Sequence, residues 1–159
     1  LKLSKLDANV IQFYEEKINL KKFIDEIIKN GKILESDKKI ITLEDIFSYL
    51  TSDIYENLLY SDKYYKEMPI NFYIPSSYYD NSLKSGNILS SGVIDLLFIT
   101  NDTYNIVDYK TDKVSSMDEL KDLYKIQLDL YEIALREKMN AKNVKKFIYS
   151  IYLGKFIEV

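Results

Sequence analysis

The chain has 159 residues, of which 47% are hydrophobic and 30% are charged, so it is long enough for one folded domain and short for two. Its net charge of −3 gives no global basic field, and any contact with nucleic acid must be local or be delivered by a larger partner. Cysteine and histidine are absent, which excludes disulfides, zinc knuckles, cysteine-held iron–sulfur clusters and nucleophiles activated by histidine. No signal peptide or spanning apolar run is visible, so we expect a cytoplasmic location without membrane contact.

Two helices are predicted in the N-terminal part of the chain. Apolar residues recur at helical spacing from Leu20 to Ile28, and Gly31 is suited to end that helix. A second helix is predicted to begin at Thr42, where a Thr-x-x-Asp spacing resembles a capping box, and to continue through Leu58. Both helices are expected to pack a core or to dock on a neighbouring domain rather than to carry out chemistry.

An extended segment is predicted from Glu67 to Pro75. Because Pro69 and Pro75 cannot donate a backbone hydrogen bond, a strand here would lie at the edge of a sheet. Glu67 itself is most simply a solvated charge before that strand. The polar stretch 81–91 contains Gly86 and indicates a loop that leads to the next strand.

The centre of the chain is predicted to be a β-hairpin with strands 92–98 and 106–110, both apolar on the two faces. A two-residue turn would place Asp95 directly opposite Asp108, where like charges repel, whereas a three-residue loop would separate them. Lys110 shares a face with Asp108. A divalent cation held by both acids would turn the repulsion into coordination; the alternative is a structural ion cluster without chemistry.

The longest helix is predicted to begin after the capping box Ser116-x-x-Glu119 and to end near Asn140. Gln127 and Tyr131 lie on its apolar face, one turn apart, so a buried amide is presented to the sheet and must find partners. This amide could satisfy a sheet edge or serve a site.

Strands at residues 145–153 and 156–159 follow the long helix, on either side of Gly154. The order of helices, three strands, a helix and two strands indicates an α/β fold with one mixed sheet. We expect a single domain in which residues 1–66 form a helical lead-in and residues 67–159 form the core. The first residue is Leu1 and not an initiator Met, so we expect a piece of a longer protein.

Three motifs occur in order along these elements: Gly92-x-x-Asp95, Asp108-Tyr-Lys-Thr-Asp112 and Gln127-x-x-x-Tyr131. In this order and spacing the sequence resembles the RecB-type branch of the PD-(D/E)XK nuclease superfamily. Within that branch it most resembles the C-terminal nuclease domains of the AddA subunits of AddAB helicase–nucleases. The resemblance runs from the helical lead-in to Gly154, and it implies a restriction-endonuclease-like core.

The resemblance implies a role for each matching residue. Asp95 and Asp108 would be metal-binding acids for Mg²⁺ or Mn²⁺, with the main-chain carbonyl of Tyr109 as a further ligand. Lys110 would be the catalytic lysine, which either stabilises developing charge or orients water. Glu67 matches an acid that precedes the first core strand in this branch.

The helix motif and the start of the chain complete the comparison with the family. Gln127 and Tyr131 match the motif that supports the site and contacts the DNA backbone. RecB-type nucleases usually carry one more ligand, a histidine on an upstream helix, which this chain lacks. Leu3-x-x-Leu6-Asp7 looks like the segment just downstream of that histidine, so we expect that this piece starts too late to include it. Because that ligand is missing, we expect activity to be weak or absent in this piece.

The implied function is that of a Mg²⁺-dependent DNA exonuclease domain in an ATP-dependent helicase–nuclease that acts in double-strand break repair and recombination. A metal would supply Lewis acidity and lower the pKa of water for phosphodiester hydrolysis. The chain has no phosphate-binding loop for ATP, so helicase domains of the same natural chain would deliver single-stranded DNA, and the partner would be an AddB-like subunit. The alternative is a catalytically silent docking domain that grips such a partner through its leading helices.

Overall fold

The computed structural model describes residues 19–26, 28–30, 43–78, 82 and 85–159. The chain divides into two compact units, Leu1–Thr51 and Ser52–Val159. In the first unit, residues 19–26 are helical and helix α2 spans Leu43–Leu50. The helix predicted from Leu20 is confirmed over the described residues, while its predicted end at Gly31 and the segment Leu3 to Asp7 lie outside them.

The predicted helix from Thr42 to Leu58 is wrong in one respect, because the helix is interrupted and α3 (Asp53–Leu59) begins anew. Ser52 has extended backbone angles, and its hydroxyl oxygen accepts a hydrogen bond from the Tyr55 N–H at 3.2 Å. A serine in this position satisfies one of the free amide groups at a helix start. The apolar spacing continues across the break, which is why periodicity alone predicts a single helix.

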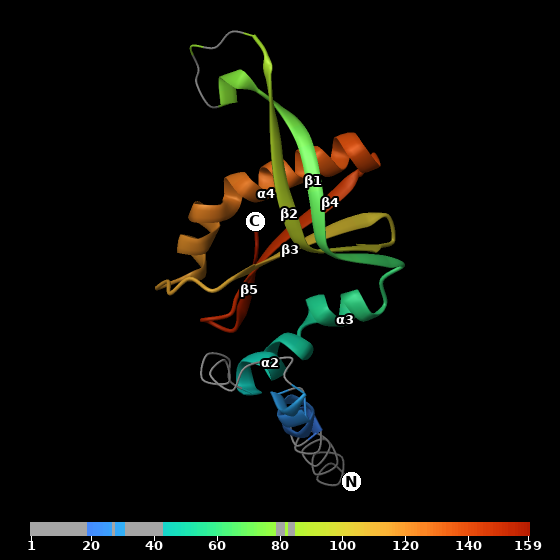
Figure 1. The fold of residues 1–159 in the computed structure, drawn as a ribbon, viewed down its shortest axis with the longest axis vertical. Helices are drawn as coiled ribbons and strands as arrows, with labels where there is room; N and C mark the ends of the chain where they lie inside the picture. Colours follow the sequence, from blue (N-terminus) through green and yellow to red (C-terminus); the bar gives the residue numbers. More distant parts are fainter. Residues whose placement is uncertain (1–18, 27, 31–42, 79–81, 83–84) are drawn as a thin grey trace, which may run out of the picture. The chain divides into compact units, whose positions relative to one another are not determined.

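The second unit is built on a five-stranded sheet whose strands are neighbours in chain order, from β1 to β5 (Figure 1). Adjacent strands are antiparallel except β3 and β4, which are parallel and are connected by the long helix α4. The predicted α/β fold with one mixed sheet is therefore confirmed. The elements are β1 (Lys63–Pro75), β2 (Asn87–Thr100), β3 (Thr103–Lys110), α4 (Met117–Met139), β4 (Asn143–Ser150) and β5 (Lys155–Glu158).

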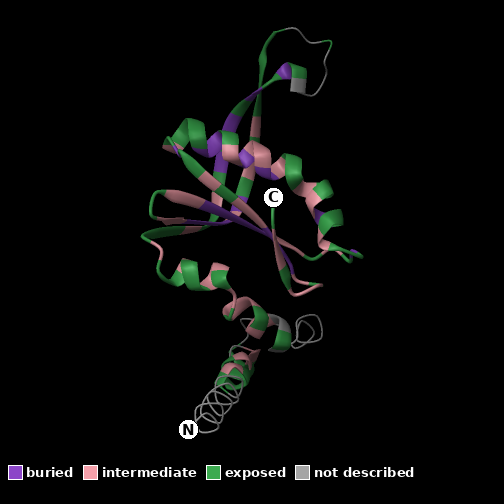
Figure 2. Cartoon of the chain, turned by 180° about the vertical axis from the view of Figure 1, so that it is seen from behind, coloured by how far each residue is buried: buried purple, intermediate pink, exposed green. Residues whose placement is uncertain are grey.

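The first two strands form a long ribbon that continues past the other strands. β1 is an edge strand, as its two prolines predict. The prediction of a loop over residues 81–91 is wrong at its end, since Asn87 to Ser91 pair with Asn71 to Pro75 as the first part of β2. The polar side chains are tolerated there because one face of this ribbon is open to solvent, as the green stretches in Figure 2 show.

The hydrophobic core lies between the sheet and α4, and Figure 2 shows buried stretches along the strands and in the middle turns of this helix. α4 is capped by Ser116 at its start and by Asn140 at its end, as predicted, and Asn140 has the left-handed conformation. The predicted apolar face is confirmed by the burial of Leu120, Leu128 and Leu135. The largest core side chains come from all parts of the unit: Phe72, Ile74, Ile94, Leu97, Ile106, Leu120, Leu128, Leu135 and Ile148.

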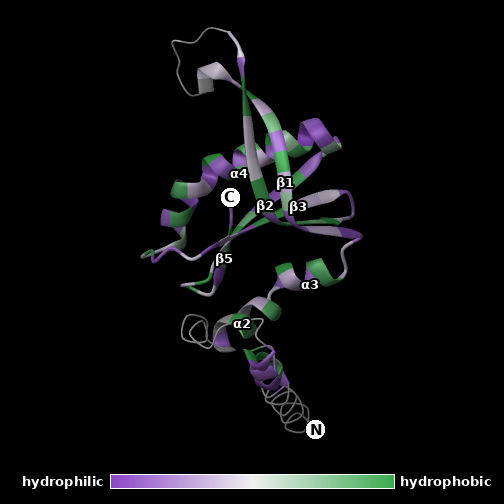
Figure 3. Ribbon diagram, in the orientation of Figure 1, coloured by the Kyte–Doolittle hydropathy of each residue, from purple (hydrophilic) through white to green (hydrophobic). Residues whose placement is uncertain are grey.

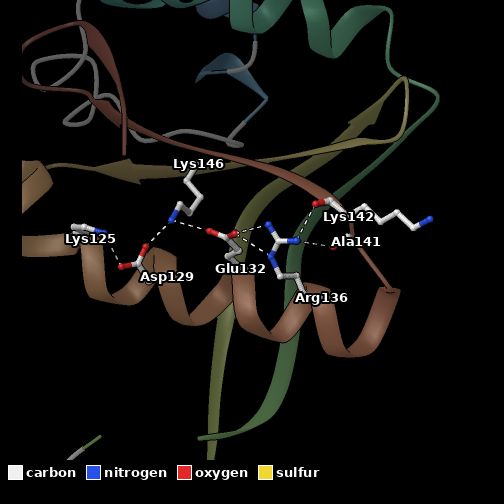
Figure 4. Close-up of polar contacts among 7 residues, drawn as sticks. All are labelled: Lys125, Asp129, Glu132, Arg136, Ala141, Lys142 and Lys146. Atoms are coloured by element: carbon white, nitrogen blue, oxygen red, sulfur yellow. Dashed lines mark hydrogen bonds and ion pairs between the residues drawn. The ribbon is translucent and has the colours of Figure 1, made fainter.

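Hydrophilic and hydrophobic stretches alternate along α4 (Figure 3), and one hydrophilic face forms an ion-pair network with β4. Lys146 of β4 lies 2.5 Å from Asp129 and 2.8 Å from Glu132, its side chain only 11% exposed (Figure 4). Arg136 pairs with Glu132 at 2.8 Å and donates to two main-chain carbonyls after the helix. We call Lys125, Asp129, Glu132, Arg136 and Lys146 the Lys146 cluster.

The Lys146 cluster fixes α4 on the sheet, and the helix carries Gln127 and Tyr131 on another face. Burial alone would raise the pKa of Asp129 and of Glu132, but the hydrogen bonds from Lys146 and the neighbouring cations outweigh it and hold both pKa values below their usual range.

In the part of the chain that the structure describes, no helix has the length and apolar character needed to cross a membrane.

Candidate active site

The two-residue turn between β2 and β3 sets the predicted register. Asn101 and Asp102 both have positive φ, 49° and 58°, as a tight hairpin turn requires, and Thr100 pairs with Thr103. The ladder continues to Leu96 opposite Val107, one row before Asp95 and Asp108. Beyond Leu96 and Val107, the pairing between the main chains of β2 and β3 gives way to a side-chain contact. The Tyr109 N–H donates a hydrogen bond to Oδ2 of Asp95 at 2.8 Å.

Asp108 is a charged side chain inside the core, 2% exposed. Burial raises the pKa of its carboxyl group; the ammonium group of Lys110 opposes this shift, and the charges of Asp95 and Asp112 add to it. Nζ of Lys110 lies 2.6 Å from Oδ2 of Asp108. Despite this ion pair, Oδ2 is buried without a well-directed hydrogen bond from any described residue. The ammonium group of Lys110 is therefore the partner of this buried oxygen.

The buried amide predicted on the long helix connects the site residues. Nε2 of Gln127 donates to Oδ1 of Asp108 at 3.4 Å and to the hydroxyl of Tyr131 at 3.0 Å. Its Oε1 accepts from Nζ of Lys110 at 3.4 Å. The structure therefore brings Asp108, Lys110, Gln127 and Tyr131 together in one network.

Gly92 lies directly against the ring of Tyr131. A Cβ atom built on Gly92 would lie 2.6 Å from Cε1 and 2.8 Å from the hydroxyl oxygen of Tyr131, both closer than van der Waals contact permits. The glycine of the Gly92-x-x-Asp95 motif therefore lets the strand approach the helix, where the tyrosine hydroxyl meets Gln127.

Two residues to which the sequence motifs assigned no role lie beside the site: Tyr124, which contacts Lys110, and Asp112, which contacts Tyr124. Nζ of Lys110 lies 4.0 Å from the centroid of the Tyr124 ring, a cation–π contact. The Tyr124 hydroxyl donates to Asp112 at 3.0 Å, and burial together with this acceptor raises the pKa of Tyr124. A signal for Tyr124 and Asp112 was present in the sequence, because Tyr124 precedes Gln127 by one helical turn and Asp112 follows Lys110 by two residues.

Glu67 has an unexpected place in the fold. It lies inside β1 rather than before it, with a left-handed φ of 49°, and the pairs on either side of it align it with Asp95. Successive side chains on a regular strand point to opposite faces, so residues three apart should not share a face. Tyr65 and Met68 nevertheless both pack on the core, which means that the alternation of side chains along β1 is interrupted at Glu67. Ile94 and Leu97 do the same on β2. Both strands therefore kink at this row.

The kink does not join Glu67 to the other site residues. Its side chain is exposed, and among the described residues it has no hydrogen bond or ion pair with the Asp108 network. No group of three or more acidic side chains that could hold a metal occurs in the described ranges. The assignment of Asp95 and Asp108 as metal-binding acids therefore stays a prediction; in the structure, Oδ2 of Asp108 faces the ammonium group of Lys110.

Comparison with known proteins supports the similarity noted in the motifs. A model of the PD-(D/E)XK nuclease superfamily matches residues 43–156. The AddA-type subunit of the ATP-dependent helicase/nuclease from Staphylococcus haemolyticus is 34% identical over 85% of this chain and 12% of its own length. Its counterparts from Ligilactobacillus salivarius (36% identity) and Clostridium botulinum strain Okra (30%) match 87% and 91% of this chain. The chain spans only 11–12% of the length of these relatives.

Proposed function

Because the chain belongs to the PD-(D/E)XK nuclease superfamily, we propose that it is a metal-dependent DNA exonuclease domain that hydrolyses phosphodiester bonds. Its five-stranded mixed sheet is the restriction-endonuclease-like core of that superfamily. One observation carries the proposal: a buried aspartate, Asp108, contacts both Lys110 and Gln127 and lies one residue from the backbone amide that binds Asp95.

The acids Asp95 and Asp108, with the main-chain carbonyl of Tyr109, would hold Mg²⁺ or Mn²⁺. The buried carboxylate of Asp108 supports this assignment, since a hard cation prefers carboxylate oxygens and Oδ2 already lies 2.6 Å from a cationic group, the ammonium of Lys110. When bound, the ion would supply Lewis acidity toward the phosphate and would lower the pKa of an attacking water. An acid pair that binds a cation also relieves the unfavourable burial of the Asp108 charge.

The other network residues have separate roles in the proposal. Lys110 places a positive charge beside Asp108, where negative charge on the scissile phosphate would develop. Gln127 orients both groups, because its oxygen accepts from Lys110 while its nitrogen donates to Asp108. Tyr131 holds the Gln127 amide through its hydroxyl and is thus a positioning residue.

The test is cleavage of end-labelled single-stranded DNA with Mg²⁺ or Mn²⁺, with a chelator as the blank, by the longer natural protein of which this chain is expected to be a piece. Asp108→Asn keeps the shape of the side chain and is expected to reduce the rate at least about a hundredfold, because metal catalysis is worth several kcal/mol. Asp122→Asn, an exposed acid on α4, is the matched control and is expected to leave the rate unchanged. If Asp108→Asn cuts as well as the unmodified chain, the nuclease assignment is wrong.

The wider assembly is also a proposal. The relatives are named as parts of an ATP-dependent helicase/nuclease, so we propose that a motor in the same natural chain and a second, AddB-like subunit complete the enzyme that serves break repair. The alternative of a silent docking domain that grips a partner through its leading helices keeps one specific support: Phe23, on the first of these helices, is 59% exposed. Metal-independent binding of a partner protein, together with no cleavage by the assembled enzyme, would favour that alternative.

A further inference from the structure

A groove of about 270 Å³ lies between α3 and the beginning of β1. We call it the Tyr64 groove, and it is formed by six residues of the second unit: Tyr55, Leu58, Leu59, Ser61, Tyr64 and Lys66. Large apolar surfaces are open to solvent there, since Tyr64 is 58% exposed and Leu59 is 65% exposed. Exposed aromatic and aliphatic groups gathered at one groove often mark a binding site.

The chemistry of the groove suits a nucleotide. Among the six residues Lys66 is the charged one and it is positive, so none of the six carries a carboxylate that would repel a phosphate. Nζ of Lys66 lies 5.7 Å from the centroid of the Tyr64 ring. An exposed tyrosine beside a lysine combines a face on which a base can stack with a charge for the adjoining phosphate.

The groove is also close to the candidate active site along the sheet. Lys66 pairs with Leu96, the residue that follows Asp95, and neighbouring strands lie about 4.8 Å apart. Leu96 and Phe98, which pair with Lys66 and Tyr64, are buried but lie outside the core cluster that faces α4. The groove therefore opens on the other face of β1. Because β1 is the edge strand, a polynucleotide could run from that face over the edge to Asp95.

We propose that the Tyr64 groove binds a second nucleotide of the single-stranded DNA substrate, on the other face of the sheet from the Asp108 site. A base stacks on the Tyr64 ring between Leu58 and Leu59, and the neighbouring phosphate pairs with Lys66. This inference rests on the proposed function, because it gives the same DNA strand a second point of contact. The groove would hold the strand while the site removes nucleotides from its end.

The first measurement is the affinity of the full chain for a fluorescent oligothymidylate, followed by anisotropy in the presence of chelator so that no cleavage can occur. Tyr64→Ala is expected to weaken binding about tenfold, since a stacked base contributes about 1–3 kcal/mol and tenfold corresponds to about 1.4 kcal/mol. Tyr64→Phe keeps the ring and is expected to bind normally. Tyr73→Ala is the matched control, because Tyr73 is 56% exposed on the same strand but lies outside the groove.

The second measurement is the salt dependence of the same affinity. Lys66→Ala is expected to reduce the slope of log K against log salt by about 0.7, the value for one phosphate contact on a single strand. Lys142→Ala is the control: Lys142 is exposed at the far end of α4, and its side chain points away from the Lys146 cluster in Figure 4.

The outcomes separate this inference from the nuclease proposal. If Tyr64→Ala and Lys66→Ala bind DNA like the unmodified chain, the groove does not bind the strand and belongs to another ligand, such as a protein segment, whatever the cleavage assay shows. If both variants lose affinity while their controls do not, the groove is a DNA contact even should Asp108→Asn leave cleavage unchanged. In that case only the nuclease assignment fails.

Discussion

At the scale of single residues, the site depends on a glycine as much as on its charged groups. Gly92 makes room for the ring of Tyr131, whose hydroxyl holds the Gln127 amide that contacts both Asp108 and Lys110. A motif that reads Gly-x-x-Asp therefore contains two different requirements. In the proposed function Asp95 is needed for its oxygen atoms, whereas the glycine is needed because a Cβ atom would collide with Tyr131 of the helix.

Gly92→Ala is expected to destabilise the fold by about 1–3 kcal/mol, because the new methyl group overpacks the contact with Tyr131. It is also expected to lower the cleavage rate through displacement of the Gln127 amide. Urea unfolding measures the first effect. Ser91→Ala, next to it on the exposed side, is the control and is expected to change little.

A double-mutant cycle identifies the cause. In a Tyr131→Leu background the hydroxyl and much of the ring edge are gone, so Gly92→Ala is expected to cost less than in the native background. Additive costs would mean that the glycine is required for some reason other than the tyrosine ring.

At the scale of elements, the residues of turns and helix caps made the strand register and the helix ends predictable from the sequence. The Thr100 to Thr103 turn fixes the register of the central hairpin, and Ser116 and Asn140 fix the ends of α4, so these features were predictable from local chemistry. The kink at Glu67 was not, because a left-handed glutamate inside a strand follows from tertiary packing on both sides of it. Contacts between distant elements, such as the ring of Tyr131 against Gly92, lack a local signal for the same reason.

The attachment of α4 to β4 gives a prediction at this scale. Lys146→Met keeps the apolar stem but leaves Asp129 and Glu132 without their shared partner. Since the two acids retain some access to water and have Lys125 and Arg136, we expect a loss of about 1–3 kcal/mol at neutral pH, between the values for surface and buried pairs. Lys145→Met, an exposed neighbour on β4, is the control.

The pH dependence of this loss has a definite sign. The pKa values of Asp129 and Glu132 are lowered in the folded protein, so their contribution is present above the unfolded values of about 3.9 and 4.3 and is lost as pH falls through the folded values. Burial lowers the pKa of Lys146, but its two acidic partners raise it overall, so its contribution is lost only in strong alkali. The stability curves of the native chain and Lys146→Met should converge in acid; a constant gap would contradict the ion-pair explanation.

At the scale of the whole molecule, the folded chain carries a cost that a bound cation would remove. Asp108 is buried, its pKa is raised by that burial, and the charge of Asp95 adds to the shift. In the proposed function, the two acids and the lysine lower the stability of the fold and in exchange form a site, which is a common trade in enzymes. The stability of the second unit should therefore respond to the metal and not only to its hydrophobic core.

Thermal unfolding with and without Mg²⁺ tests this link independently of catalysis. A ligand that binds only the folded state stabilises it, by about 2.7 kcal/mol at a hundred times its dissociation constant, so Mg²⁺ is expected to raise the Tm of the native chain. Asp108→Asn removes a ligand charge and is expected to abolish most of this rise, whereas Asp122→Asn should retain it. Equal shifts for all three proteins would mean that Mg²⁺ acts elsewhere on the surface, because the effect would then be independent of the only fully buried acid among the described residues.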